Sequence, residues 1–131
     1  HVGVSDAFHP LSHHQNDPNK IGRLLKIQEY HSQIFAAFID KLAALPDGDN
    51  GSMLDNSIML YGSNMSNSNA HDHYPLPSAI VGKAGGAIKR NQHIIAPERT
   101  PVSNLMLTIL DRIGVQPDDG FGDSTGLITE V

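Results

Sequence analysis

Apolar side chains recur at helical spacing in two stretches of the chain. The first stretch begins after Pro18 and repeats every three or four residues, at Ile27, Tyr30, Ile34, Phe38, Leu42 and Leu45. The second follows Pro101 with the same kind of spacing, at Val102, Leu105, Met106, Ile109, Leu110 and Ile113. One apolar face on each stretch predicts two amphipathic helices.

Signals for helix ends agree with these patterns. Asp17-Pro18 and Thr100-Pro101 each combine a capping side chain with a proline, as at the first turn of many helices. Pro46 with the polar loop 47–51 ends the first helix, and Gly114 ends the second. Residues 1–16 lack a sustained period, so we expect a loop there.

Two short apolar runs, 57–62 and 78–81, are bounded by polar loops and predict strands buried on both faces. Stretches 87–88 and 93–95 are candidates for short edge strands. The order helix, strand, strand, helix favours an α/β layered fold, with two main helices against a small, mostly buried sheet. Ligands in such folds collect beyond the carboxyl ends of the strands, where the polar loop 63–73 leaves the first strand.

Composition limits the function classes. The hydrophobic fraction is 39% and the aromatic fraction 5%, so we expect a thin core in residues 1–131, either a single domain or the C-terminal portion of a larger α/β domain. The net charge of −5 without a basic run argues against nucleic-acid binding. The chain has no cysteine, which excludes thiolate sites, and its longest apolar run, 34–39, is too short to span a membrane.

Five of the eight histidines lie in two short clusters, at 9–14 and 71–73. His9 and His13 share a face if their segment is helical, and His71 and His73 point to one side of an extended segment. His14 and Asp72 complete the set, with Asp72 as a ligand or as the group that orients a histidine. We therefore expect the clusters to converge on a divalent metal ion, zinc-like in its ligands, or on an anion. Solvated loop histidines are the alternative.

Other polar residues have simpler interpretations. Ser12 and Ser63 are the hydroxyls nearest the clusters, and each is either a nucleophile or an ordinary loop residue. We expect His31 to be a packing residue and His93 to lie at the surface. The glycine-rich stretch 82–86 reads as a tight turn, and the acidic tail 117–126 is expected to be ordered only if it docks.

The string His9-Pro10-Leu11-Ser12-His13-His14 resembles the H-x-x-S-H-H signature of a family of uncharacterised, mostly secreted bacterial proteins. Two further stretches, 61–77 and 103–126, are similar to the same family, so the resemblance spans nearly the whole chain. It implies the C-terminal portion of such a protein and a secreted or periplasmic location.

That family is a remote relative of the alkaline phosphatase and sulfatase superfamily. The resemblance implies an α/β/α sandwich that binds divalent metals through Asp and His and hydrolyses phosphate or sulfate esters. His71, Asp72 and His73 would correspond to the superfamily's C-terminal metal ligands, with His9, His13 and His14 supplying others. No segment matches the one that carries the superfamily's nucleophile, so the catalytic residue is not assigned.

Two hypotheses follow. The first is a metal-dependent, hydrolase-like domain for a small anionic phosphate or sulfate ester. The second is a non-catalytic secreted binding or structural domain that retains the fold. In either case a small sheet leaves open edges, which a missing N-terminal region or a second copy of the chain would cover.

Overall fold

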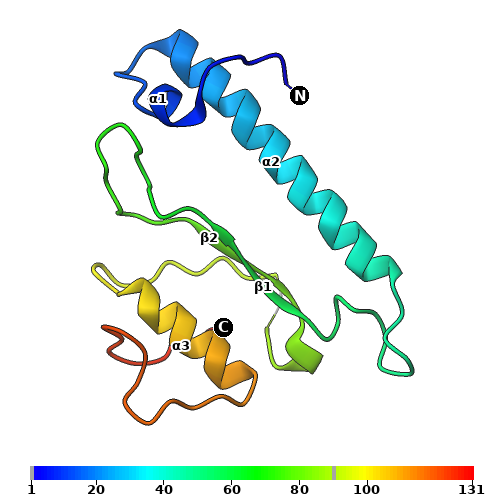
Figure 1. The fold of residues 1–131 in the computed structure, drawn as a ribbon. Coiled ribbons are helices and arrows are strands. Elements are labelled where there is room, and N and C mark those ends of the chain that lie inside the picture. The colour runs from blue at the N-terminus through cyan, green and yellow to red at the C-terminus, as the bar shows by residue number, and fades with distance from the viewer. Residues whose placement is uncertain (1, 90) are drawn as a thin grey trace. The chain divides into compact units, whose positions relative to one another are not determined.

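The computed structural model describes residues 2–89 and 91–131, and has the small α/β fold that the pattern predicts. The described chain contains three α-helices and a two-stranded antiparallel sheet (Figure 1). The elements are α1 (Phe8–Ser12), α2 (Pro18–Ala44), β1 (Ile58–Gly62), β2 (Ser78–Gly82), the short 3₁₀ helix η1 (Ala84–Gly86) and α3 (Val102–Arg112). His1, within the stretch expected to be a loop, and Arg90 lie outside the described residues.

The chain divides into two compact units. The first comprises His1–Ala44 and Leu60–Ile80, and the second comprises Leu45–Met59 and Val81–Val131.

The long helix α2 forms where the sequence predicts it. The Asp17 side chain accepts a hydrogen bond from the backbone N–H of Asn19 (2.8 Å), and its carbonyl accepts one from Ile21 (3.0 Å), which confirms the predicted cap. The helix ends at Ala44, before the loop that begins at Leu45. Leu24 is the buried side chain of α2, whereas Leu25, Ile34 and other apolar residues of the helix are exposed. The core against this helix is therefore thin.

The expectation of a loop over residues 1–16 is wrong for 8–12, which form α1. This single turn packs against α2 and buries Leu11, which is 2% exposed. A five-residue helix is marginal by propensity, and tertiary burial of this kind is what stabilises it. The turn matters for function, because it places His9 and His13 at helical spacing.

The two strands also form where the sequence predicts them, but the expectation that they are mostly buried is wrong. Residues of β1 and β2 are half-buried or exposed, and Leu60 is 36% exposed. A sheet of two strands has no central strand, which is the position that buries both faces. Gly82 has φ +111° and lies so close to the Ser57 carbonyl that a Cβ atom would overlap it. This close approach of the two backbone segments therefore requires glycine.

Stretches 87–88 and 93–95 form no strand, so the expectation of edge strands there is wrong. Side chains hold this segment to the chain's last residues instead. Lys89 Nζ donates to the Thr129 carbonyl (3.2 Å) and Gln92 Nε2 to that of Glu130 (2.9 Å).

Helix α3 confirms the second predicted helix, but the face that it buries is polar. Its buried side chains are Ser103, Asn104 and Thr108, the last of them 0% exposed. The tail docks on this face. Asn104 exchanges two hydrogen bonds with Thr125 (3.1 and 2.8 Å), and Thr108 Oγ1 accepts one from the backbone N–H of Ile128 (2.8 Å).

Two further contacts fix the tail. Ser103 Oγ donates to Asp123 Oδ1 (2.5 Å), and Arg112 donates through Nε and Nη2 to the Val131 carbonyl (3.0 and 2.7 Å). The acidic tail is thus an ordered part of the second unit. Within the described residues, no helix combines the length and hydropathy needed to cross a membrane.

Candidate functional site

The two histidine clusters meet within the first unit, where α1 lies beside the loop between β1 and β2 (Figure 1). Two hydrogen bonds join these segments. Ser68 Oγ donates to the Ser12 carbonyl (2.9 Å), and the backbone N–H of Gln15 donates to Asn69 Oδ1 (2.7 Å). These bonds span 56 and 54 residues of sequence, so they fix the approach of the clusters.

Three of the predicted site residues are brought together. His9 Nε2 and His13 Nε2 lie 3.1 Å apart, with ring centroids separated by 5.0 Å. The ring of His71 contacts that of His13 edge-on, with centroids 4.9 Å apart and planes at 82°. The spacing of four on a helical turn aligns the first pair, and the loop supplies the third ring.

The backbone around these residues is unusual. His71 has φ +54°, and Gln15 and Asn16, just after α1, have φ +51° and +59°. This left-handed region is uncommon for residues other than glycine, although histidine and asparagine enter it more often than most. Backbone strain of this kind is often found at functional sites.

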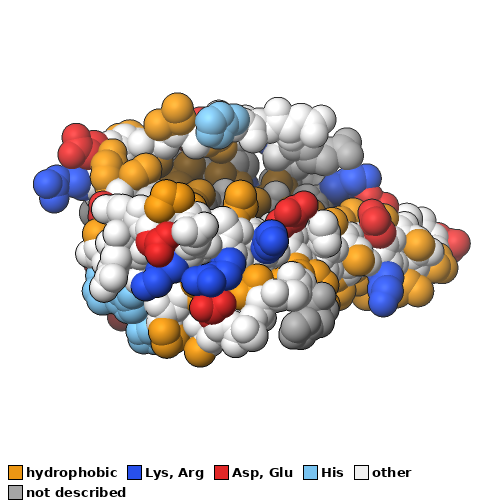
Figure 2. All heavy atoms as spheres, turned by 90° about the horizontal axis from the view of Figure 1, so that it is seen from above, with side chains coloured by type: hydrophobic (Ala, Val, Ile, Leu, Met, Phe, Trp, Pro, Cys, Tyr) orange, Lys and Arg blue, Asp and Glu red, His pale blue; other side chains and the backbone are white. Residues whose placement is uncertain are grey.

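A cavity of about 290 Å³ opens beside the histidines. Besides histidines, its lining residues carry hydroxyl, amide, thioether and apolar groups. They are Phe8, His9, Ser12, His13, Leu24, Gln28, Ser63, Asn64, Met65, Ser66, Ser68 and His71. We call it the histidine pocket. Figure 2 shows histidine side chains gathered at the surface at one edge of the molecule. No lysine, arginine, aspartate or glutamate is among these lining residues.

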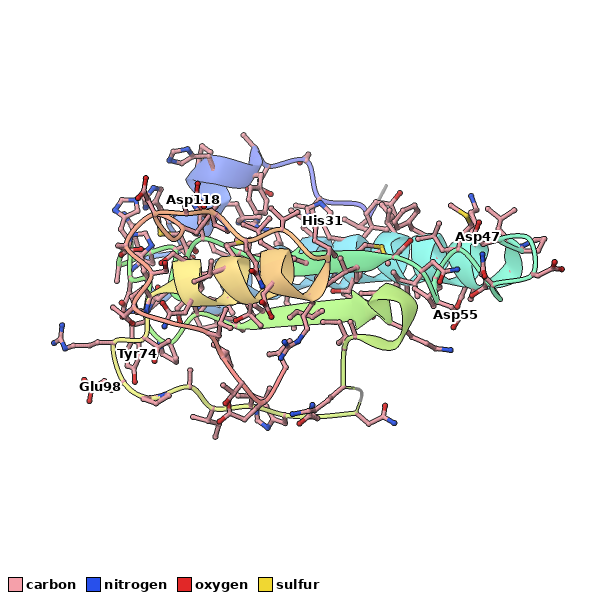
Figure 3. The ribbon with its side chains drawn as sticks, turned by 90° about the horizontal axis from the view of Figure 1, so that it is seen from below. His31, Asp47, Asp55, Tyr74, Glu98 and Asp118 are labelled. Carbon is pink, nitrogen blue, oxygen red and sulfur yellow. The ribbon has the colours of Figure 1, made fainter. Side chains whose placement is uncertain are left out.

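The other three predicted ligands do not line this pocket. Each is held by a local hydrogen bond. His14 Nδ1 accepts one from the backbone N–H of Asn16 (3.1 Å), and Asp72 Oδ1 accepts one from that of Tyr74 (3.0 Å; Tyr74 is labelled in Figure 3). His73 Nδ1 lies 2.6 Å from the Asn64 carbonyl, which fixes Nδ1 as the protonated nitrogen.

The pair His9 and His13 fits two positions of a metal centre. With Zn–N bonds of about 2.0–2.1 Å, two nitrogens on a tetrahedral ion lie about 3.3 Å apart, close to the separation found here. No group of three or more His, Cys, Asp or Glu is arranged to hold a metal ion in residues 2–89 and 91–131. The two Nε2 atoms are thus spaced like two ligands of such an ion, and any further ligand would have to come from a rearranged side chain, water or substrate.

The two candidate hydroxyls differ. Ser12 Oγ donates its proton to the His9 carbonyl (2.8 Å), which is an ordinary helix contact. Ser63, which lines the histidine pocket as Ser12 does, accepts a hydrogen bond on Oγ from the backbone N–H of Met65 (3.1 Å). A donor on Oγ stabilises negative charge there, so Ser63 is the better placed of the two for nucleophilic chemistry. The sequence alone did not separate them.

Sequence reasoning missed Met65 as a pocket residue. It lies in a segment of turn-forming residues without periodicity, so no spacing signal marks it. Of the other two singled-out histidines, His93 is exposed, as expected. His31 (labelled in Figure 3) is exposed as well, with its ring 6.1 Å from that of the exposed Phe8, so the expectation of a packing residue there is wrong.

The clearest electrostatic feature lies in the second unit, at Asp55 (labelled in Figure 3). Its carboxylate forms an ion pair with Lys83 and accepts hydrogen bonds from the Ser52 backbone N–H and hydroxyl, both at 2.8 Å. The Lys83 contact, followed by those from Ser52, lowers the pKa of Asp55 well below its ordinary value. These contacts tie the loop after α2 to the turn after β2, which is a structural role.

No family model, curated protein or solved structure matches this chain. The functional argument therefore rests on the geometry of the histidine pocket and on the residues that line it.

Proposed function

We propose that the histidine pocket binds a divalent transition metal ion through His9 and His13, and that the chain is a metal-dependent, hydrolase-like domain for phosphate or sulfate esters. The observation that carries this proposal is the 3.1 Å separation of the two Nε2 atoms beside an open cavity. A bidentate chelate leaves several coordination positions open, and an anionic oxygen is a suitable ligand for them.

The lining of the pocket supports an anionic substrate bound with the metal. Neutral hydroxyl and amide groups donate hydrogen bonds to ester oxygens, but they supply no net charge. A bound divalent ion supplies that charge and polarises the ester as a Lewis acid. The absence of carboxylates from the lining leaves nothing there to repel the anion.

Individual residues have distinct tasks in this proposal. Ser63 is the candidate nucleophile, because the Met65 N–H stabilises charge on its Oγ. His71, beside His13, is the candidate group to accept or return a proton, since an imidazole does both near neutral pH. The side-chain amides of Gln28 and Asn64 are placed to orient substrate oxygens.

The proposal is consistent with the resemblance of the string 9–14, which contains His9 and His13, to the H-x-x-S-H-H signature. By that resemblance the whole protein is a secreted relative of the alkaline phosphatase and sulfatase superfamily, with a layered α/β/α sandwich. The two-stranded sheet and the exposed apolar side of α2 then belong to a larger assembly, completed by an N-terminal region or by a second copy of the chain.

The second candidate function is a non-catalytic binding or structural domain that retains the fold. Two observations favour it: among the described residues no third ligand joins His9 and His13, and the Ser12 hydroxyl is bonded to the backbone. Metal content and turnover separate the two candidates.

The experiment compares the wild-type protein with His9→Ala and His13→Ala, with His93→Ala as a matched control on an exposed histidine. The proposal predicts one equivalent of metal by elemental analysis after supplementation with Zn²⁺, lost in both pocket variants and kept in the control. It also predicts slow hydrolysis of p-nitrophenyl phosphate or sulfate that requires the metal. Metal binding without turnover favours the binding domain, and no metal in the wild type overturns both the chelate and the hydrolase.

A further inference from the structure

The residues that line the histidine pocket offer a particular set of possible metal ligands. His9, His13, His71 and Met65 are among its lining residues, together with residues that carry hydroxyl and amide groups. Carboxylates, which hold most Mg²⁺, Ca²⁺ and Mn²⁺ ions in proteins, are absent from the lining. The chain also has no cysteine to provide a thiolate.

These donors discriminate among metals by their softness. Imidazole suits copper, zinc and nickel, and among divalent ions a nitrogen site of this kind binds Cu²⁺ most tightly. A thioether is a soft ligand that selects Cu(I) and contributes little to hard cations. A histidine and methionine pocket without carboxylates therefore favours copper.

The placement of Met65 and His71 strengthens this argument. Met65 is half-buried on the loop that carries His71, and its unbranched side chain adapts readily to an irregular cavity. The ring of His71 already contacts that of His13, with centroids 4.9 Å apart. Both residues therefore lie beside the His9 and His13 pair in the same pocket.

We infer that the histidine pocket is selective for copper, with Met65 as the thioether ligand that stabilises Cu(I). This inference deepens the proposed function by naming the ion, and it rests on the same pair of histidines. The competing interpretation is that Met65 is a wall of the pocket and that only the imidazoles bind.

The test measures Cu(I) affinity by competition with the chromophoric chelator bicinchoninate, and Cu²⁺ affinity by titration followed by electron paramagnetic resonance. Met65→Leu keeps the size and hydrophobicity of the side chain but removes the sulfur. We expect it to weaken Cu(I) binding at least tenfold and to change Cu²⁺ binding less than threefold. Met53→Leu, a methionine outside the pocket, is the matched control and should leave both affinities unchanged.

The two oxidation states of copper distinguish ligation from packing. Loss of a soft sulfur ligand weakens Cu(I) binding more than Cu²⁺ binding, whereas loss of packing weakens both alike. Equal Cu(I) affinity in wild type and Met65→Leu overturns the inference, as does displacement of copper by millimolar Mg²⁺ or Mn²⁺. Circular dichroism of each variant verifies folding before its affinity is compared.

The outcomes also separate this inference from the proposed function. If Zn²⁺ binds through His9 and His13 and copper is not preferred, the inference fails and the hydrolase proposal stands. If copper binds as expected but no ester is hydrolysed with any metal, the inference stands and the hydrolase proposal fails.

Discussion

The polar face of α3 and the histidine pocket are both clusters of polar side chains assembled from distant parts of the sequence, but their hydrogen bonding differs. On α3, Asn104 and Thr108 bond directly to the tail, and their groups are satisfied within the protein. In the pocket, the Nε2 atoms of His9 and His13 face each other across 3.1 Å beside an open cavity.

This difference is the basis for interpreting the α3 cluster as structural and for proposing that the histidine pocket binds a ligand. A buried polar group with complete hydrogen bonds stabilises one conformation and has no capacity left for a ligand. Among the described residues, the Nε2 atoms of His9 and His13 form a hydrogen bond only with one another, and under the proposed function both would instead donate an electron pair to a shared cation. The predictions below test this distinction.

The largest effect is expected in the pocket. His13→Ala removes one arm of the chelate and should lower Zn²⁺ affinity at least about 100-fold, the upper end of the loss seen for groups that only support a ligand. Isothermal titration of wild type and variant measures it, with His93→Ala as the control. If the variant binds Zn²⁺ as tightly as wild type, the proposal that the histidine pocket binds a metal ion is wrong.

The next effect is expected on α3. Thr108→Val keeps the shape of a side chain that is 0% exposed but removes the acceptor of the Ile128 N–H. Leaving that donor unsatisfied should cost about 1–3 kcal/mol in the free energy of unfolding, measured in urea. Ser32→Ala, on the exposed side of α2, is the control and should stay within about 0.5 kcal/mol. If Thr108→Val has the same free energy of unfolding as wild type, the hydrogen bond from Thr108 to the tail does not stabilise the fold.

The contact of Phe35 with Tyr61 tests packing in the first unit, because neither residue lines the histidine pocket. Their rings are stacked, with centroids 4.3 Å apart and planes at 11°. A double-mutant cycle with Phe35→Leu and Tyr61→Leu should give a coupling energy of about 0.5–1.5 kcal/mol, and neither single variant should alter metal affinity. Loss of metal binding in either would mean that the pocket depends on this packing as well as on its own contacts.

The smallest effect is expected at Asp55, whose ion pair with Lys83 is partly exposed. Because folding lowers the pKa of Asp55, its contribution to stability is present above the unfolded-state pKa of about 3.9 and is lost as the pH falls through the folded-state value. Wild type should therefore lose stability in acid more steeply than Asp55→Asn, which is the less stable protein at pH 7. Asp40→Asn, on α2, is the control, and identical acid profiles for wild type and Asp55→Asn would refute this assignment.

The sequence predicts the elements better than it predicts their partners. Local periodicity predicts helices α2 and α3, and Asp17, Pro18 and Gly114 mark helix ends. Short apolar runs predict both strands. The buried face of α3 does not, because Asn104 and Thr108 become interior only when a tail some twenty residues away docks on them. Local patterns contain no information on that contact.

In the candidate site, too, local sequence predicts the segments but not the contacts between them. The composition of segments 9–14 and 71–73 indicates a site, and His9, His13 and His71 do meet. Which members meet depends on the bonds of Ser68 and Gln15 and on the turn of α1, and these are tertiary effects. His14, Asp72 and His73 have local partners that spacing alone does not reveal.

The most direct test of the account is the position of a metal ion in crystals of the protein grown with Zn²⁺, located by anomalous scattering at the zinc edge. A zinc peak is expected about 2.0–2.1 Å from the Nε2 atoms of both His9 and His13, within the histidine pocket. A pocket without a peak, or a zinc ion bound only by His14, Asp72 or His73, would contradict it.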